Sequence, residues 1–184
     1  RICAMESKLT HANEEWDSRL ERLHKTEGEI LEILSGVMIF ESLTREELQM
    51  VERIVHRREF LPQEVVVRQG APGVGMYIIQ SGSTDVVLEV GDEEVIRLAS
   101  LTDGQFFGEM SLLDGSPRAA SVIATERSQI IGFFSSDLMD LIGRSPRLGF
   151  KIVLRISQLM GNRLRETVKE YRSALRELRE HSDH

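Results

Sequence analysis

Residues 106–122 read Phe106-Phe107-Gly108-Glu109-Met110-Ser111-Leu112-Leu113-Asp114-Gly115-Ser116-Pro117-Arg118-Ala119-Ala120-Ser121-Val122. The stretch predicts a turn glycine, one short turn of helix, a second Gly/Pro turn, and a strand that begins with small residues. Backbone N–H groups at the start of such a helix point outward and favour negative charge. Arg118 adds a planar fork of donors suited to a phosphate, and the Glu109 carboxylate can accept from a sugar hydroxyl. The segment therefore predicts a pocket for a small anion that carries a hydroxyl group.

This segment resembles the phosphate-binding cassette of cyclic nucleotide-binding domains. That family includes protein kinase A regulatory subunits, bacterial catabolite activator proteins and cyclic-nucleotide-gated channels. The likeness rests on Gly108-Glu109, Leu113-Asp114-Gly115 and Pro117-Arg118-Ala119-Ala120, and continues over about residues 37–165 through Phe40-Glu41-Ser42-Leu43, Gly70, Tyr77-Ile78-Ile79 and Ser81-Gly82. The resemblance implies that Glu109 binds the ribose 2′-OH and Arg118 the cyclic phosphate. It implies a cyclic-nucleotide site made by Phe107, Gly108, Glu109, Met110, Ser111, Arg118, Ala119, Ala120 and Ser121.

The resemblance also implies which nucleotide base the pocket prefers and which residues cover it. Relatives that prefer cGMP often carry Thr or Ser where this chain has Ala119, so cAMP is the expected ligand and cGMP is less favoured. A long C-terminal helix covers the base in the family, which makes Arg163, Thr167 and Tyr171 candidates for capping it, with Met160 and Leu164 beside them. The same residues also fit a heptad seam or a solvated helix face. The chain departs from the family pattern at Val74-Gly75, where relatives often have an acidic residue followed by a hydroxyl residue.

Composition narrows the function classes. The chain has 184 residues, 41% hydrophobic and 29% charged, with a net charge of −7, which argues against a general nucleic-acid coat. Cys3 is the single cysteine and indicates a reducing, cytoplasmic compartment. No apolar run approaches the roughly 20 residues of a membrane helix. The five histidines lie outside the predicted strands and are not spaced as metal ligands, and Gly70, Gly75 and Gly82 read as turn glycines. No metal, cofactor or enzymatic activity is expected.

The chain divides into three expected parts. Residues 1–36 form an amphipathic helical arm with an imperfect heptad seam, and residues 37–145 form the nucleotide-binding β-roll that contains the cassette. Within that part, Thr44 and Glu47 predict a capping box for a helix over residues 44–55. Residues 146–184 form a long helix that serves as lid and dimerisation element.

The strands and the second short helix are expected at definite places. Strands are predicted over residues 64–68, 76–80, 84–90, 94–98, 121–124 and 129–134. A helix over residues 135–142 has Ser135 or Ser136 as its N-cap. The expected fold is mainly β, an eight-stranded roll resembling a jelly roll or double-stranded β-helix, with N-terminal helices and a long C-terminal helix.

The expected function is that of a bacterial cyclic-nucleotide sensor, as the resemblance to catabolite activator proteins implies, which acts as a homodimer through its helices. Ligand binding rearranges the C-terminal helix and so regulates a downstream effector whose identity the sequence leaves open. Three alternatives stand beside this. The chain is the sensor half of a transcription factor, the regulatory domain of a channel or kinase, or a dimerisation module with a degenerate pocket. The chain begins with Arg1, which leaves room for an output domain elsewhere, and DNA binding is not expected for this chain alone.

Overall fold

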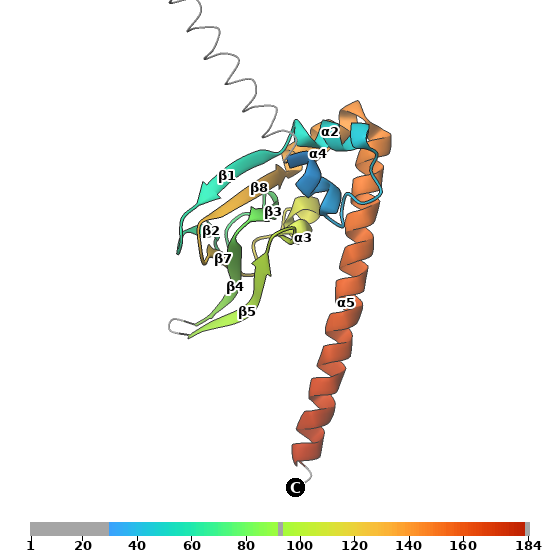
Figure 1. Cartoon of the computed structure of the whole chain (residues 1–184). Coiled ribbons are helices and arrows are strands. Elements are labelled where there is room, and N and C mark those ends of the chain that lie inside the picture. Colours follow the sequence, from blue (N-terminus) through green and yellow to red (C-terminus); the bar gives the residue numbers. More distant parts are fainter. Residues whose placement is uncertain (1–29, 92–93, 183–184) are drawn as a thin grey trace, which may run out of the picture.

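We obtained a computed structural model of the chain, which describes residues 30–91 and 94–182. Eight strands form two four-stranded antiparallel sheets (Figure 1). The first sheet has the order β1-β8-β3-β6, with bounds His56–Phe60, Ser128–Phe134, Gly75–Ser81 and Phe106–Phe107. The second has the order β2-β7-β4-β5, with bounds Val65–Val67, Ser121–Ala124, Ser83–Val90 and Glu94–Thr102. This arrangement confirms the predicted eight-stranded roll with flanking helices.

The cassette bridges the two sheets. Its first strand, β6, pairs with β3 in the first sheet, where Phe107 lies opposite Tyr77. Its last strand, β7, pairs with β4 in the second sheet, where Val122 lies opposite Val86. The short helix α3 (Glu109–Asp114) lies between these strands along the chain. Because both ends of the cassette are fixed by strand pairing, the intervening loop and helix are held at the seam between the sheets.

Helices pack on the first sheet and form the main core with it. They are residues 30–36, α2 (Arg45–Glu52), α4 (Ser135–Arg144) and the first part of α5 (Pro146–Ser182). The side chains that they bury together include Leu34, Val51, Met76, Ile131, Phe133, Leu138, Leu148, Ile152 and Ile156. Burial of each such side chain stabilises the fold by about 1.5–3 kcal/mol. The core therefore anchors the start of α5 firmly to the roll.

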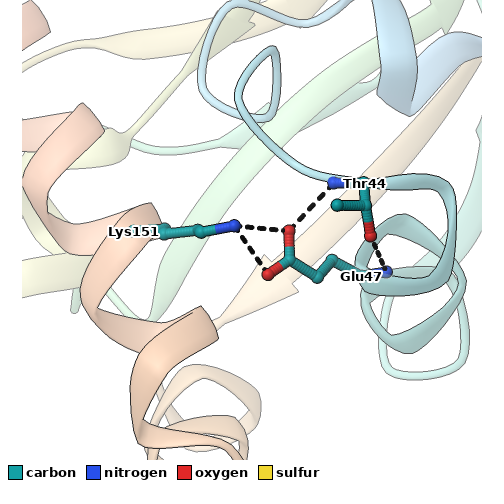
Figure 2. A network of polar contacts seen from close by, with 3 residues as sticks. All are labelled: Thr44, Glu47 and Lys151. Carbon is teal, nitrogen blue, oxygen red and sulfur yellow. Dashed lines mark hydrogen bonds and ion pairs between the residues drawn. The ribbon is translucent and has the colours of Figure 1, made fainter.

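Polar contacts reinforce this anchor. The Lys151 ammonium on α5 donates to both carboxylate oxygens of Glu47, at 2.7 and 2.8 Å (Figure 2). Glu47 also accepts from the Thr44 backbone N–H, and its own N–H donates to the Thr44 hydroxyl, which confirms the predicted capping box. Farther along α5, Arg155 donates to the Met38 carbonyl at 3.0 Å. The start of α5 is thus tied to the N-terminal end of α2 and to the turn before it.

The second part of α5 is different. Figure 1 shows that α5 runs past α3 and continues well beyond the roll. The large apolar side chains of this second part are exposed, including Leu164, Val168, Tyr171 and Leu175. Within the described part of the chain, no helix is long and apolar enough to cross a membrane.

Several local predictions were wrong or incomplete. Strand β1 was missed, and His56 opens it, so one histidine does lie in a strand. The two-residue strand β6 was also missed. The N-cap of α4 is Phe134, whose N–H donates to the Asp137 carboxylate at 3.1 Å, and neither Ser135 nor Ser136 caps the helix.

The role of Gly75 also differs from the prediction. It opens strand β3, which pairs with β8, and does not lie in a turn. Glycine is needed there because an added Cβ would lie 2.5 Å from the Phe133 carbonyl oxygen of the neighbouring strand. Of the predicted N-terminal arm, residues 1–29 lie outside the described residues, and residues 30–36 are helical as predicted.

Candidate functional site

A turn at Gly108 connects strand β6 to helix α3 within the cassette. Gly108 has φ +79°, a left-handed conformation that glycine adopts without strain. An added Cβ would lie 2.3 Å from the Arg118 guanidinium and 3.0 Å from the Gly75 carbonyl oxygen. Only glycine therefore allows the start of α3 and the arginine to approach each other this closely.

Arg118 is a buried cation held by backbone carbonyls. Its side chain is almost fully buried, at 6% exposure. Nη2 donates to the Gly75 carbonyl at 2.6 Å, and Nη1 makes a longer contact of 3.4 Å with the Gly108 carbonyl. The guanidinium also lies over the Tyr77 ring, 5.4 Å from its centroid. Among the described residues it forms no ion pair, and burial lowers its pKa from the ordinary value.

Glu109 is the second buried charge, at 5% exposure. Its Oε1 forms an ion pair with Arg163 of α5, and the Arg163 guanidinium lies over the Phe106 ring, 5.1 Å from its centroid. In the part of the chain that the structure describes, Oε2 accepts no hydrogen bond. The carboxylate therefore links the cassette to α5 and keeps one oxygen available.

A pocket with a cavity volume of about 170 Å³ lies beside these groups. It is lined by Val67, Val86, Phe107, Gly108, Glu109, Met110, Ser111, Ser116, Pro117, Arg118, Ala119, Ala120 and Val122. Eight of the nine predicted site residues are in this set, all except Ser121. The lining combines one cationic, one anionic and several apolar side chains, so the pocket suits a small ligand with an anionic group and an apolar body.

Ser121 lies next to the pocket and faces away from it. Its neighbour Val122 lines the pocket, and successive side chains of a strand point to opposite faces. The Ser121 hydroxyl accepts from the Gln69 backbone N–H at 2.9 Å and donates to the Glu89 carboxylate at 2.8 Å.

The predicted base-capping residues are on α5, and only one of them reaches the site. Arg163 contacts Glu109. The Thr167 hydroxyl donates to the Arg163 carbonyl within the helix, at 3.0 Å, and Tyr171 is 64% exposed. Neither of these two lines the pocket.

Sequence reasoning missed the pocket wall formed by strands. Val67, Val86 and Val122 come from β2, β4 and β7 and meet through strand pairing. The alternation of β-branched residues in those strands was the available signal, because the cassette strand has to place every second side chain against the ligand.

Comparison with known proteins gives consistent results. The sequence profile of the cyclic nucleotide-binding domain matches residues 57–145. A putative potassium channel protein of Rhodopseudomonas palustris is 34% identical over 120 residues, which are 65% of this chain and 29% of that protein. The cyclic AMP receptor protein of Thermus thermophilus is 32% identical over 134 residues, which are 72% of this chain and 60% of that protein. The chain thus spans less than two thirds of the length of either relative.

Solved structures agree in fold. The crystal structure of a cyclic nucleotide-binding domain from Methylobacillus flagellatus has a TM-score of 0.69 and 27% identity, and the match covers 79% of this chain and 82% of that one. The Thermus thermophilus catabolite activator protein has a TM-score of 0.66 and 31% identity, with 72% of this chain and 61% of that chain covered.

Proposed function

We propose that the pocket beside α3 binds a 3′,5′-cyclic nucleotide, with cAMP preferred, because residues 57–145 match the sequence profile of the cyclic nucleotide-binding domain. The observation that carries the proposal is Arg118, a buried cation that has no ion-pair partner among the described residues and lines the pocket. A buried charge without a counter-charge is costly. A cyclic phosphate entering the pocket supplies that counter-charge and accepts from the planar guanidinium.

The second charged group, the Glu109 carboxylate, binds the ribose in this proposal. In a 3′,5′-cyclic nucleotide the 2′-OH is the free hydroxyl of the ribose, and it donates to Oε2 of Glu109. Ala119 and Ala120 have side chains small enough for the phosphate to approach the backbone, and Gly108 lets the cassette turn close to Arg118. Alanine at position 119 offers guanine no hydroxyl, which supports the preference for cAMP over cGMP.

The pocket supports binding without catalysis. Among the described residues, its lining contains a single carboxylate, that of Glu109, and no histidine or cysteine. Acid–base hydrolysis of the phosphodiester needs a second group placed to activate water. We therefore propose a regulatory protein that binds and releases its ligand intact.

We propose that α5 is the element that ligand binding moves. Its first part is anchored by the core and by the Lys151–Glu47 ion pair, whereas its second part meets the cassette through Arg163 and Glu109. A ligand hydroxyl on Oε2 and Arg163 on Oε1 share the Glu109 carboxylate, which couples ligand binding to the contact between α5 and the cassette. The base then gives Thr167 and Tyr171 a surface on which to close. A ligand shifts such an equilibrium by its difference in affinity for the two positions.

The exposed stripe on α5 supports a homodimer. Leu164, Val168, Tyr171 and Leu175 follow one another at steps of four, three and four residues, as at the seam of a coiled coil. One flank of this seam carries Arg165, Arg172 and Arg179, and the other carries Thr167. Parallel helices place each arginine flank against the partner's uncharged flank, whereas antiparallel helices place arginine against arginine. The charge pattern therefore favours parallel pairing.

Calorimetric titration of the purified chain with cAMP and cGMP tests the proposal. Micromolar or tighter binding of cAMP, with weaker binding of cGMP, supports a cAMP sensor. A folded chain that binds neither nucleotide refutes it and leaves the dimerisation module as the remaining explanation. Sedimentation of the same sample with and without cAMP tests the dimer.

A further inference from the structure

The hydroxyl of Ser121 lies at the centre of a polar network on the outer face of the second sheet. Ser121 is only 2% exposed, and both hydrogen-bonding functions of its hydroxyl are used. It accepts from the Gln69 backbone N–H at 2.9 Å and donates to Glu89 Oε1 at 2.8 Å. The network joins the segment after β2 to β7 and β4, and it lies behind the pocket wall.

The side chain of Gln69 fastens the same segment a second time. Its amide nitrogen donates to the Glu89 carbonyl at 3.1 Å, and its amide oxygen accepts from the Glu89 N–H at 2.8 Å. The Gln69 amide thus makes the same pair of hydrogen bonds to the Glu89 backbone that a residue of a neighbouring strand would make. Gln69 is consequently held to β7 through its backbone and to β4 through its side chain.

The two residues that follow Gln69 hold the backbone of Arg118. The Gly70 N–H donates to the Arg118 carbonyl at 2.8 Å, and the Arg118 N–H donates to the Ala71 carbonyl at 2.9 Å. Farther along the same connection, the Gly75 carbonyl accepts from the Arg118 guanidinium at 2.6 Å. The connection between β2 and β3 therefore positions both the backbone and the side chain of Arg118.

We propose that Ser121 is a positioning residue for the phosphate site: its hydroxyl fixes Gln69, and through Gly70 and Ala71 it sets the place of Arg118. This inference rests on the proposed function, in which Arg118 binds the cyclic phosphate. Ser121 itself touches no ligand, because its side chain points away from the pocket. A guanidinium that recognises phosphate with two donors depends on its orientation, so a small displacement of this backbone weakens binding.

The first test compares Ser121→Ala with Ser121→Thr by calorimetric titration with cAMP. Ser121→Ala removes both hydrogen bonds of the hydroxyl and is expected to weaken binding about tenfold. Ser121→Thr keeps the hydroxyl and is expected to stay within about twofold of the wild type. Gln69→Met, which keeps the length of the side chain and removes its amide, provides a second variant at a less buried position. Thermal unfolding of each variant shows that it is folded at the titration temperature.

The second test is a double-mutant cycle that separates positioning from general destabilisation. In an Arg118→Gln background the effect of Ser121→Ala on the dissociation constant is expected to disappear, whereas in a Glu109→Gln background it is expected to remain about tenfold. An equal effect in both backgrounds, or unchanged affinity in Ser121→Ala, overturns the positioning role alone. Absence of cAMP binding by the wild-type chain overturns the proposed function with it.

Discussion

Replacement of Arg118 by glutamine is expected to weaken cAMP binding about a hundredfold. In the free protein Nη2 is engaged with the Gly75 carbonyl at 2.6 Å, while Nη1 makes only the 3.4 Å contact with Gly108. A hydrogen bond between charged groups contributes about 1.5–3 kcal/mol. Two such bonds to the phosphate, less the carbonyl contact that is weakened on binding, leave about 3 kcal/mol. Each 1.4 kcal/mol changes affinity tenfold, which gives about two orders of magnitude.

The same substitution is expected to leave the fold stable. Burial lowers the pKa of Arg118, so the folded protein holds this positive charge at a cost that glutamine removes. The free energy of unfolding should therefore change by no more than about 1 kcal/mol. Urea denaturation of both proteins measures this directly.

A matched control separates the site from the overall charge. Arg97→Gln also removes one positive charge, but at an exposed strand position where the arginine pairs with Asp85 at 3.6 Å. Calorimetric titration with cAMP should give the wild-type dissociation constant for this control. If Arg118→Gln binds cAMP within threefold of the wild type while remaining folded, the assignment of Arg118 to the phosphate is refuted.

Four further predictions concern neighbouring groups. Gly73→Ala should lower the free energy of unfolding by about 2 kcal/mol, because an added Cβ lies 2.2 Å from a cassette carbonyl oxygen; unchanged urea denaturation would contradict this. Ala119→Thr should raise the affinity for cGMP relative to cAMP about fivefold, through one new hydrogen bond, and an unchanged ratio of dissociation constants would disprove it. Arg163→Gln should weaken cAMP binding about fivefold, since it removes the half-exposed partner that orients Glu109; tighter binding would show competition instead. Glu47→Gln should lower the free energy of unfolding at pH 7 by about 1 kcal/mol. The hydrogen bond from Lys151 lowers the pKa of the Glu47 carboxyl from its ordinary value. The stabilisation that the ion pair gives the wild type is therefore present above that ordinary pKa, and it is lost as the pH falls through the lowered pKa of the folded protein. The difference in free energy of unfolding between wild type and Glu47→Gln should vanish once Glu47 is protonated, and a difference that persists at pH 2 would refute the ion pair's role.

Much of the fold could be predicted because strands and turns leave local signals. The runs of β-branched residues and the turn glycines gave six of the strands, and Thr44 with Glu47 gave a helix start. Strand β1 left no such signal, since its first four residues are His56, Arg57, Arg58 and Glu59, and all are exposed. Its place in the sheet comes from pairing with β8, a contact between distant parts of the sequence.

In the site too, residues fixed by a local motif could be predicted, whereas contacts between distant positions could not. Glu109 and Arg118 could be predicted because the cassette fixes residue types at fixed spacing. Gly75 could not be recognised as a partner of Arg118, because its contribution is a backbone carbonyl that any residue possesses. The contact of Arg163 with Glu109 joins positions 54 residues apart, and it depends on how α5 packs across the roll. Ser121 was assigned to the site by its place in the motif, and only strand alternation shows which way its side chain points.

The two buried charges of the pocket have separate partners, and this separation suggests separate tasks. Arg118 rests on neutral carbonyls and forms no ion pair among the described residues, so a phosphate can reach it without first breaking one. Glu109 is already paired with α5 through one oxygen and offers the ribose the other. Had the two side chains paired with each other, a ligand would have to break a buried ion pair before gaining anything from either. As they are arranged, the phosphate gains affinity from a cation that no described carboxylate pairs with directly, whereas the ribose contacts the carboxylate that also binds Arg163 of α5. Affinity should therefore depend chiefly on Arg118, and the response of α5 to the ligand on Glu109 and Arg163.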